Sequence, residues 1–440
     1  MKKRITVYAK LVYEMLQLGK FSRQAFLMKK RLIISVIILT VFIFSSLLLF
    51  RFRTHPLITK LTDTHWGFVT INQVAKITDI PFFYYHFYSN SLPTYNLFIK
   101  GNDLDKLFQS IPNPQKTPIV AGFNTRVPAI FVSDLGNQYK VRLKYRGNTA
   151  THWAYNKKSF RLRFSDGKSF KNLNTIDLII PEDRGLVLEH LANFRAKKLN
   201  LLAPVSWFAN LKINQKSQGL YYLTERIDQD FILNRQLNGT LFGEKDDINN
   251  WNANIYQDEN LWRTYPEDPH HPDFKYLKQL LELINDPSST TQEILSLLDL
   301  DNFLAWQVHS LIMASHNQNQ SHNNRLFYNH EIKKFQFIPW DTGQQQIDAF
   351  TLDQPYHPLV DRLLQDEIIK KKRDQLLLDY INNPQNLSED KDFFQTALDS
   401  VYVPLIQDNQ KFYPNLKYLL DINSYKDWID QHFNNLVNQL

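Results

Sequence analysis

The segment that most constrains the fold of this chain is Phe335–Gly343, which reads FQFIPWDTG. Phe335 and Phe337 flank a polar residue, as in a short strand that is buried on one face. Asp341 follows this strand, and Gly343 permits the chain to turn sharply. A carboxylate at a strand end, followed by a glycine turn, is typical of phosphotransferases, where it binds a metal ion beside a nucleotide. The same pattern also fits an ordinary strand-ending turn, so its interpretation depends on the other motifs.

The composition excludes several classes of site. The chain has 440 residues, enough for one large or two ordinary domains, and it has no cysteine, which excludes disulfides and thiolate catalysis. Only 12 residues are glycine, and neither Gly-x-Gly-x-x-Gly nor a Walker-type loop occurs. No carboxylate near the histidines would complete a zinc site, so zinc is not predicted. The chain also lacks the paired carboxylates or nucleophile motif of a hydrolase, so a hydrolase is not predicted. The net charge of +7 includes no long basic run, so nucleic acid is not a predicted partner.

The run Leu32–Phe50 contains 19 residues without a charge. As a helix it would span about 28 Å, close to the roughly 30 Å hydrocarbon core of a bilayer. Nine of the first 31 residues are Lys or Arg, so the positive-inside rule places that end in the cytoplasm. The sequence therefore predicts an uncleaved signal anchor, a single-pass protein of the bacterial cytoplasmic membrane, and an extracytoplasmic main domain. A start at Met28 would remove most of the basic tail, and the sequence leaves this alternative open.

The rest of the chain is predicted to be one α+β unit of two lobes, with a β-rich first half and a mostly helical second half. Strand patterns occur at 95–100, 129–132, 139–145, 157–164, 209–213 and 219–225. Apolar residues keep helical spacing at 189–202, 274–284 and 294–308. The predicted domains are a basic cytoplasmic tail (1–31), a transmembrane anchor (32–50), a juxtamembrane segment (51–91), the main domain (92–375) and a helical C-terminal extension (376–440).

Four motifs resemble, in sequence order, those of the spore coat protein H (CotH) kinase family. They are Arg-Gly-Asn within Val141–Asn148, Lys-Lys-Ser-Phe within Lys157–Phe164, Gly-x-Tyr-x-x-x-Glu within Gly219–Asp228, and His-Asn with Pro-Trp-Asp within His322–Asp341. The resemblance covers roughly residues 92–375. It implies an atypical protein-kinase-like fold, behind the single transmembrane helix, that uses ATP with Mg²⁺ or Mn²⁺. The implied substrates are Ser or Thr residues of envelope or surface proteins.

The resemblance also implies which residues bind the nucleotide. Phosphoryl transfer needs cations on the phosphates, and Arg146 with one of Lys157 and Lys158 would supply them. Asn148 belongs to the same loop as Arg146, and Glu225 would pair with one of the two lysines and hold it in place. Each residue also has a purely structural interpretation. The lysines fit a solvated strand face, Arg146 a loop clamp, Asn148 a turn and Glu225 a helix cap.

Metal binding and catalysis are assigned to the last motif, in which Asp341 and Asn323 are the predicted metal ligands. In the family an acid stands before the His-Asn pair, but the stretch 317–320 contains no acid, and Asn319, with Asn323, takes the catalytic place. An amide cannot accept a proton as a carboxylate does, and losing a general base costs about 10²–10⁴ in rate. A second family acid is replaced by Gly343. The prediction is therefore either a slow Ser/Thr kinase or a pseudokinase that serves as an envelope interaction module.

Overall fold

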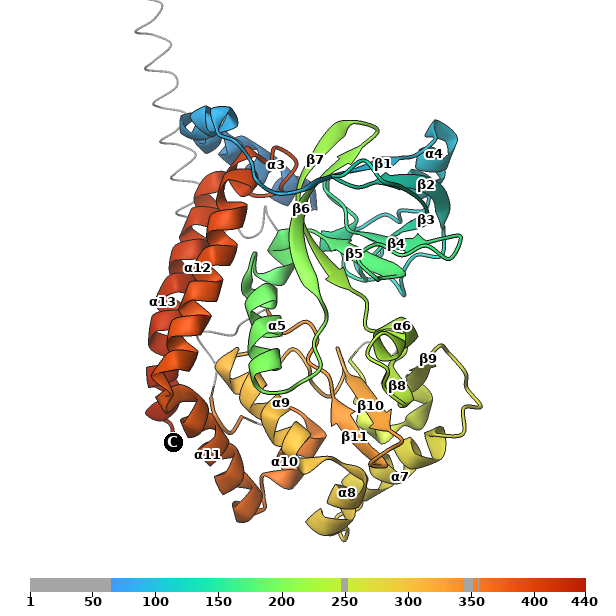
Figure 1. Ribbon diagram of the computed structural model, residues 1–440, viewed down its shortest axis with the longest axis vertical. Coiled ribbons are helices and arrows are strands. Elements are labelled where there is room, and N and C mark those ends of the chain that lie inside the picture. Colours follow the sequence, from blue (N-terminus) through green and yellow to red (C-terminus); the bar gives the residue numbers. More distant parts are fainter. Residues whose placement is uncertain (1–64, 247–251, 344–350, 355) are drawn as a thin grey trace, which may run out of the picture. The chain divides into compact units, whose positions relative to one another are not determined.

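The computed structural model describes residues 65–246, 252–343, 351–354 and 356–440. The chain divides into two compact units: one contains the residues up to Phe82 with Tyr413–Tyr418, and the other contains Phe83–Phe412 with Leu419–Leu440. In the first unit, helix α3 (His65–Ala75) leads into the 3-10 segment η1 (Lys76–Phe87), which continues into the second unit. The second unit holds both sheets of the described residues (Figure 1), and its residue ranges include every site residue discussed below.

Seven strands of the second unit form a closed barrel in the order β1-β2-β3-β4-β5-β7-β6. The strands are β1 (Thr94–Phe98), β2 (Val127–Val132), β3 (Gln138–Tyr145), β4 (Phe160–Phe164), β5 (Thr175–Ile179), β6 (Ser206–Ile213) and β7 (Lys216–Glu225). Neighbouring strands are antiparallel except β1 and β6, whose parallel pairing closes the barrel. In its core the rings of Tyr95, Phe131 and Phe170 lie with centroids 5.0 to 5.4 Å apart.

The alternation of residues along β3 decides which side chains reach the outside of the barrel. Val141, Leu143 and Tyr145 are buried in the barrel core, whereas Arg142 is exposed and Lys144 is half-buried. Side chains of a strand alternate between its two faces, so the basic residues of β3 share the outer face. This face contributes to the cavity described below.

The second half of the chain contains a sheet of its own, in the antiparallel order β11-β10-β8-β9 (Figure 1). Its strands are β8 (Gly239–Glu244), β9 (Trp262–Tyr265), β10 (Arg325–Asn329) and β11 (Lys334–Phe337). The remaining α-helices are α4 (Gly101–Gln109), α5 (Leu188–Lys198), α6 (Gln229–Leu233), α7 (Phe274–Asn285), α8 (Thr291–Leu297), α9 (Leu300–Ile312), α10 (Pro358–Leu363), α11 (Glu367–Asn382), α12 (Pro384–Gln407) and α13 (Asn415–Val437). Trp306 of α9 stacks on Phe337 of β11 with ring centroids 4.1 Å apart, which joins this sheet to the helices in one apolar core.

The predicted fold class needs two corrections. The β-rich half is a closed barrel, which local periodicity cannot reveal because the pairing of β1 with β6 joins segments far apart in sequence. The helical half contains the expected strand at Phe335–Phe337 and three further strands, β8, β9 and β10. The transmembrane helix is not retained, because no helix among the described residues is long and apolar enough to cross a bilayer. The run Leu32–Phe50 lies outside those residues. The single-pass membrane localisation and the membrane partner rested on this helix and are not retained either.

A buried ion pair joins the barrel to the end of α12. Lys157, just before β4, is 3% exposed and donates its Nζ to Asp408 and to the carbonyl of Leu220. Asp408 also accepts the N–H of Leu220 at 3.0 Å. A Cβ on Gly219 would lie 2.0 Å from the Asp408 carboxyl carbon, and the φ of Gly219 is +80°, so only glycine fits here. The Asp408 carboxylate therefore links the end of α12 to the barrel.

We expect Asp408→Ala to lower the free energy of unfolding by about 3–5 kcal/mol, because it leaves the Lys157 ammonium buried without its counter-ion. Urea denaturation of the full chain measures the loss. Asp392→Ala, at an exposed position of the same helix, is the matched control and should change stability by less than about 0.5 kcal/mol. Equal denaturation midpoints for the two variants would show that this ion pair does not hold α12 to the barrel.

Candidate functional site

A polar cavity of about 1010 Å³ is lined by the outer face of the barrel and by the sheet that contains β8 and β9. Nine lysines and arginines lie on its wall: Arg126, Lys144, Arg146, Arg161, Arg184, Arg226, Lys245, Arg263 and Arg325. Six acids accompany them: Asp177, Asp183, Glu244, Asp246, Glu267 and Asp341. The volume is at the upper end of the range for small-molecule sites. The surplus of three positive charges favours an anionic ligand.

Asp341 lies on this wall, in the turn after β11. Its φ is +61°, in the left-handed region that residues other than glycine seldom adopt and that recurs at functional sites. Glu189 of α5 holds the turn by accepting the N–H of Asp341 at 3.0 Å and that of Gly343 at 2.6 Å. The Asp341 carboxylate is ion-paired with Arg184, whose Nε lies 3.4 Å from Asp183. Asp341 is thus pinned at its backbone and neutralised at its side chain.

The acids around this turn have shifted pKa values. Burial raises the pKa of Glu189, and the charge of Arg184 only partly offsets this effect. Burial would also raise the pKa of Asp183, but His152 and Arg184 lower it to about 2. Asp183 therefore stays a carboxylate at neutral pH, and Arg184 lies between two carboxylates.

Asn323 lies on the same wall and is connected to Asp341 through a second amide. Its φ is +62°, so both predicted metal ligands adopt the left-handed conformation. The Nδ2 of Asn323 donates to the carbonyl of Asn317 at 3.2 Å, and the Nδ2 of Asn317 donates to the carbonyl of Asp341 at 2.6 Å. The backbone N–H of Asn323 donates to Glu244 at 3.2 Å. The structure therefore brings Asp341 and Asn323 to one site.

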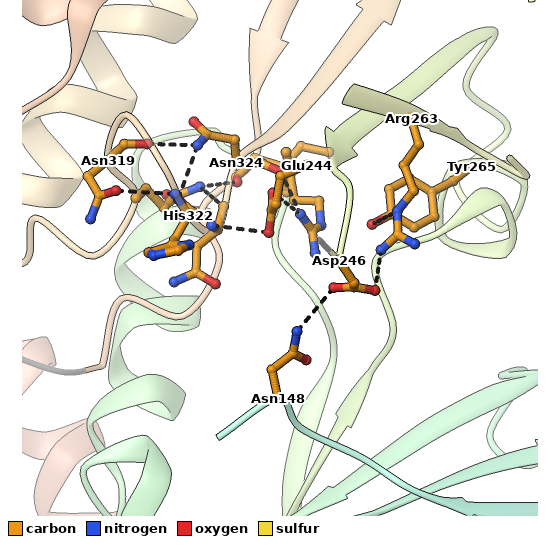
Figure 2. A network of polar contacts seen from close by, with 12 residues as sticks. Asn148, Glu244, Asp246, Arg263, Tyr265, Asn319, His322 and Asn324 are labelled. Carbon is orange, nitrogen blue, oxygen red and sulfur yellow. Dashed lines mark hydrogen bonds and ion pairs between the residues drawn. The ribbon is translucent and has the colours of Figure 1, made fainter. Parts of the chain in front are cut away.

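Asn319 shapes the loop instead of lining the cavity. Its Oδ1 accepts the N–H of Ser321 at 2.9 Å and that of His322 at 3.1 Å. Its carbonyl accepts the Nδ2 of Asn324 at 2.7 Å, and Figure 2 shows these residues in one network. The catalytic role predicted for Asn319 remains a prediction, and no carboxylate takes that place in the loop.

The structure places the two lysines and Glu225 outside the cavity wall. Lys157 is buried in its ion pair with Asp408, and Lys158 donates its Nζ to the carbonyl of Tyr155. Burial lowers the pKa of Lys158 to about 8. Glu225 pairs with Arg235 at 2.7 Å and not with a lysine. The nucleotide-binding roles predicted for these three residues remain predictions that this arrangement does not favour.

Arg146 lies on the cavity wall and is bound to Asp177, an acid that the sequence analysis missed. The Nε of Arg146 lies 3.2 Å from Asp177, and Arg161 donates to both oxygens of the same carboxylate at 2.6 and 2.7 Å. Burial, reinforced by the charge of Arg184, lowers the pKa of Arg146 to about 10. Asp177 is the one charged residue of the buried strand TIDLI, and that exception was the signal that would have revealed it.

Asn148 lies on the wall as well and links the barrel to the second sheet. Its Nδ2 donates to Asp246 at 3.3 Å, and Asp246 accepts a hydrogen bond from Arg263 of β9 at 2.9 Å (Figure 2). Between the neighbouring strands β10 and β8, Arg325 donates to Glu244 at 2.9 Å. Each acid on this side of the cavity is therefore matched by an arginine, apart from Glu267, for which no ion pair occurs among the described residues.

Three other residues have the order of a catalytic triad. The Nδ1 of His152 lies 2.9 Å from the Oγ of Ser159, and its Nε2 lies 3.1 Å from Asp183. Ser159 is fully buried, however, and its Oγ also accepts the N–H of Ile180 at 3.2 Å. A nucleophile must reach its substrate, so this arrangement gives no support to a hydrolase.

The chain is similar to known proteins over a region that contains these segments. Residues 143–384 match the family model described as CotH kinase protein. The inner spore coat protein H of Bacillus subtilis (strain 168) is 25% identical over 308 residues, which are 66% of this chain and 81% of that protein. The solved structure of the proinflammatory kinase CtkA of Helicobacter pylori covers 63% of this chain and 94% of its own, with 12% identity and a TM-score of 0.24. A likeness this loose carries no inference about the site.

We expect Asp177→Asn to lower the free energy of unfolding by about 3–5 kcal/mol, because the buried Arg146 and the half-buried Arg161 lose their shared counter-ion. Asp166→Asn, which breaks only the exposed ion pair with Lys140, should cost less than about 1 kcal/mol. Denaturant midpoints of the two variants measure the difference, and equal midpoints would contradict the role of Asp177.

Asp177→Asn also tests the pH dependence of stability. Burial opposes ionisation of Asp177, but Arg161 and Arg146 hold its pKa well below the ordinary value of 3.8. The stability that this carboxylate contributes is therefore present above that value and lost as the pH falls below it. We expect the loss of stability in acid to be smaller in Asp177→Asn than in the wild type, as measured by thermal melting from pH 6 to pH 2.

Proposed function

The chain belongs to the CotH kinase family, and from this premise we propose that its cavity binds ATP with a divalent metal ion and transfers a phosphoryl group to Ser or Thr of a protein. The observation that carries the proposal is the pairing of Asp341 with Asn323. Both residues adopt the left-handed conformation, both lie on one cation-rich wall, and Asn317 connects them. Ten other described non-glycine residues share this conformation, so the common place of Asp341 and Asn323 on the wall and their link through Asn317 are what support a functional role for them.

The residues at this position suit a magnesium or manganese ion. A carboxylate on Asp341 and an amide oxygen on Asn323 are hard oxygen ligands of the type these ions prefer. Such an ion would neutralise charge on the phosphates as the phosphoryl group is transferred. Arg184 already pairs with Asp341, so an ion must share the carboxylate with this guanidinium or displace it. We therefore expect weak metal binding in the absence of nucleotide.

The remaining chemistry falls to the cationic wall. Arg146 and Arg161 are held by Asp177, so their guanidinium groups are oriented before a ligand arrives and need no reorganisation during the reaction. The acceptor hydroxyl forms a bond to phosphorus while the bond to the leaving phosphate breaks, and its proton must pass to a base or to water. The stretch 317–320 offers no carboxylate for this step. Transfer at about 10⁻²–10⁻⁴ of an ordinary kinase rate is the expected consequence.

A non-catalytic interaction protein is the second candidate. Two observations favour it: the missing base in 317–320, and the neutralisation of Asp341 by Arg184. The relative from Bacillus subtilis is named an inner spore coat protein, which supports a protein partner in a surface layer and not the predicted membrane location. Either candidate can retain nucleotide binding, so only a transfer assay separates them.

We expect Mg-ATP to raise the thermal stability of the full chain and Asp341→Asn to abolish this effect. A ligand at about 100 times its Kd stabilises by about 2.7 kcal/mol. Asp301→Asn, at an exposed position of α9, is the matched control and should respond as the wild type does. Asn323→Ala should weaken the response and increase the concentration of metal that it requires.

Transfer of labelled phosphate to a mixed protein substrate is then measured with the same four proteins. Slow transfer that disappears in Asp341→Asn supports the kinase. Nucleotide-dependent stabilisation without any transfer supports the interaction protein. If millimolar Mg-ATP stabilises neither the wild type nor Asp301→Asn, the proposed nucleotide site is wrong.

A further inference from the structure

Three cations lie side by side on the outer face of the barrel and on the cavity wall. Lys144 of β3 pairs across the ladder with Arg161 of β4, and Arg126 directly precedes β2, whose first residue pairs with Leu143. We call Arg126, Lys144 and Arg161 the cationic row. Like charges opposite each other on neighbouring strands repel, so the row is unfavourable unless anions accompany it. Asp177, opposite Arg161 on β5, is the anion that the barrel supplies.

The single negative charge of Asp177 does not neutralise this row, because Asp177 also pairs with Arg146. Among the residues that the structure describes, neither Lys144 nor Arg126 has a carboxylate within ion-pair distance. The Nζ of Lys144 instead donates to the carbonyl of Phe123 at 2.9 Å. Two of the three charges in the row are therefore uncompensated by the protein.

The electrostatic effect of this crowding falls on Lys144. Its pKa is lowered to about 8, first by burial and then by the charges of Arg161, Arg126 and Arg226. Arg226 directly follows β7, and its Nε lies 3.4 Å from the carboxylate of Asp228. An anion bound beside Lys144 would offset the repulsion from these arginines and raise the pKa of Lys144 toward its ordinary value.

The rest of the cavity wall is balanced in charge. Arg184, Arg263 and Arg325 each pair with a carboxylate. Lys245 has no ion pair among the described residues, but it is exposed to solvent and can be neutralised by counter-ions. Arg126 is exposed in the same way, so the unpaired positive charge that is partly sheltered from solvent is that of the half-buried Lys144, in the cationic row.

We propose that the cationic row, with Arg226 beside it, is the subsite for the polyphosphate chain of the nucleotide, in place of Lys157 and Lys158. This inference rests on the proposed function. Neighbouring strands lie about 4.8 Å apart, so the row spans three strands and roughly 10 Å at its backbone. An extended chain of several negative charges matches that length, whereas one carboxylate or one phosphate would reach only part of it.

The test is calorimetric titration of the full-length wild type and Lys144→Gln with Mg-ATP, tripolyphosphate and adenosine. We expect the substitution to raise the Kd for ATP and for tripolyphosphate by about tenfold or more, as loss of one charge-assisted contact does. Binding of adenosine should be unchanged. Lys140→Gln is the matched control, because Lys140 lies on the same strand, is exposed and pairs with Asp166 outside the cavity. Its Kd values should stay within about twofold of the wild type.

A stability measurement without ligand separates this role from a structural one. The folded state holds the pKa of Lys144 near 8, below the 10.5 of the unfolded chain, so the unfolded state binds more protons between these values. The wild type should therefore gain stability from pH 8 to pH 10.5 relative to Lys144→Gln. At pH 7 the variant should melt no lower than the wild type, and a variant that melts well below it would overturn the proposal.

The remaining outcomes separate the subsite from the proposed function. If Lys144→Gln binds ATP as the wild type does while Asp341→Asn does not, the row is not the phosphate subsite and the proposed function stands. If tripolyphosphate binds and the substitution abolishes it, but ATP does not bind, the row is an anion site and the nucleotide function is wrong. If the wild type binds neither ATP nor tripolyphosphate, both proposals are overturned.

Discussion

The buried carboxylate of Glu189 fixes the turn on which the rest of the site depends. It accepts the backbone N–H groups of Asp341 and Gly343, and this brings two distant segments together backbone to backbone. A Cβ on Gly343 would lie 2.5 Å from the Glu189 nitrogen, and one on Gly185 would lie 2.6 Å from the Gly343 carbonyl. The close approach therefore requires glycine at both positions. Gly343, which departs from the family pattern, is thus explained by packing, and Arg184 is placed beside Asp341 by the same contact.

The distribution of charge in the cavity follows from how few acids accompany its arginines. Asp183, Glu244, Asp246 and Asp341 are each ion-paired, and Asp177 serves two arginines. A base must be free to accept a proton, and a metal ligand must be free to coordinate, so arginine pairing restrains both functions. Cations that are already oriented, by contrast, favour binding of a phosphorylated ligand. The geometry is therefore better prepared for binding than for proton transfer.

Local patterns predicted the strands and helices well where one face is buried. The expected strand 139–145 is β3, and the expected strands 209–213 and 219–225 are β6 and β7, each three residues longer. Barrel closure was beyond such patterns, because the parallel pairing of β1 with β6 depends on contacts across more than a hundred residues. The buried strand β5 carries no alternation, so periodicity missed it.

The site could be predicted only where a motif places a residue by local turn geometry. Asp341, Asn323, Arg146 and Asn148 lie on the cavity wall because each sits in or beside a turn at a strand end. The lysine motif does not indicate where its side chains point. Lys157 pairs with Asp408, 251 residues later in the chain, and no local pattern can reveal such a partner. The identity of its partner had to come from the tertiary structure.

That carboxylate, Asp408, also bears on where this domain ends. The segment that matches the family model ends at residue 384, which is the first residue of α12. Asp408 directly follows the last residue of that helix. A lysine and a glycine that belong to family motifs are nevertheless completed by this later residue. The compact unit that contains this ion pair, Phe83–Phe412 with Leu419–Leu440, therefore extends beyond the region that matches the family model. A homologue without a counterpart of Asp408 would need another acceptor for this buried ammonium group, or another residue in place of the lysine.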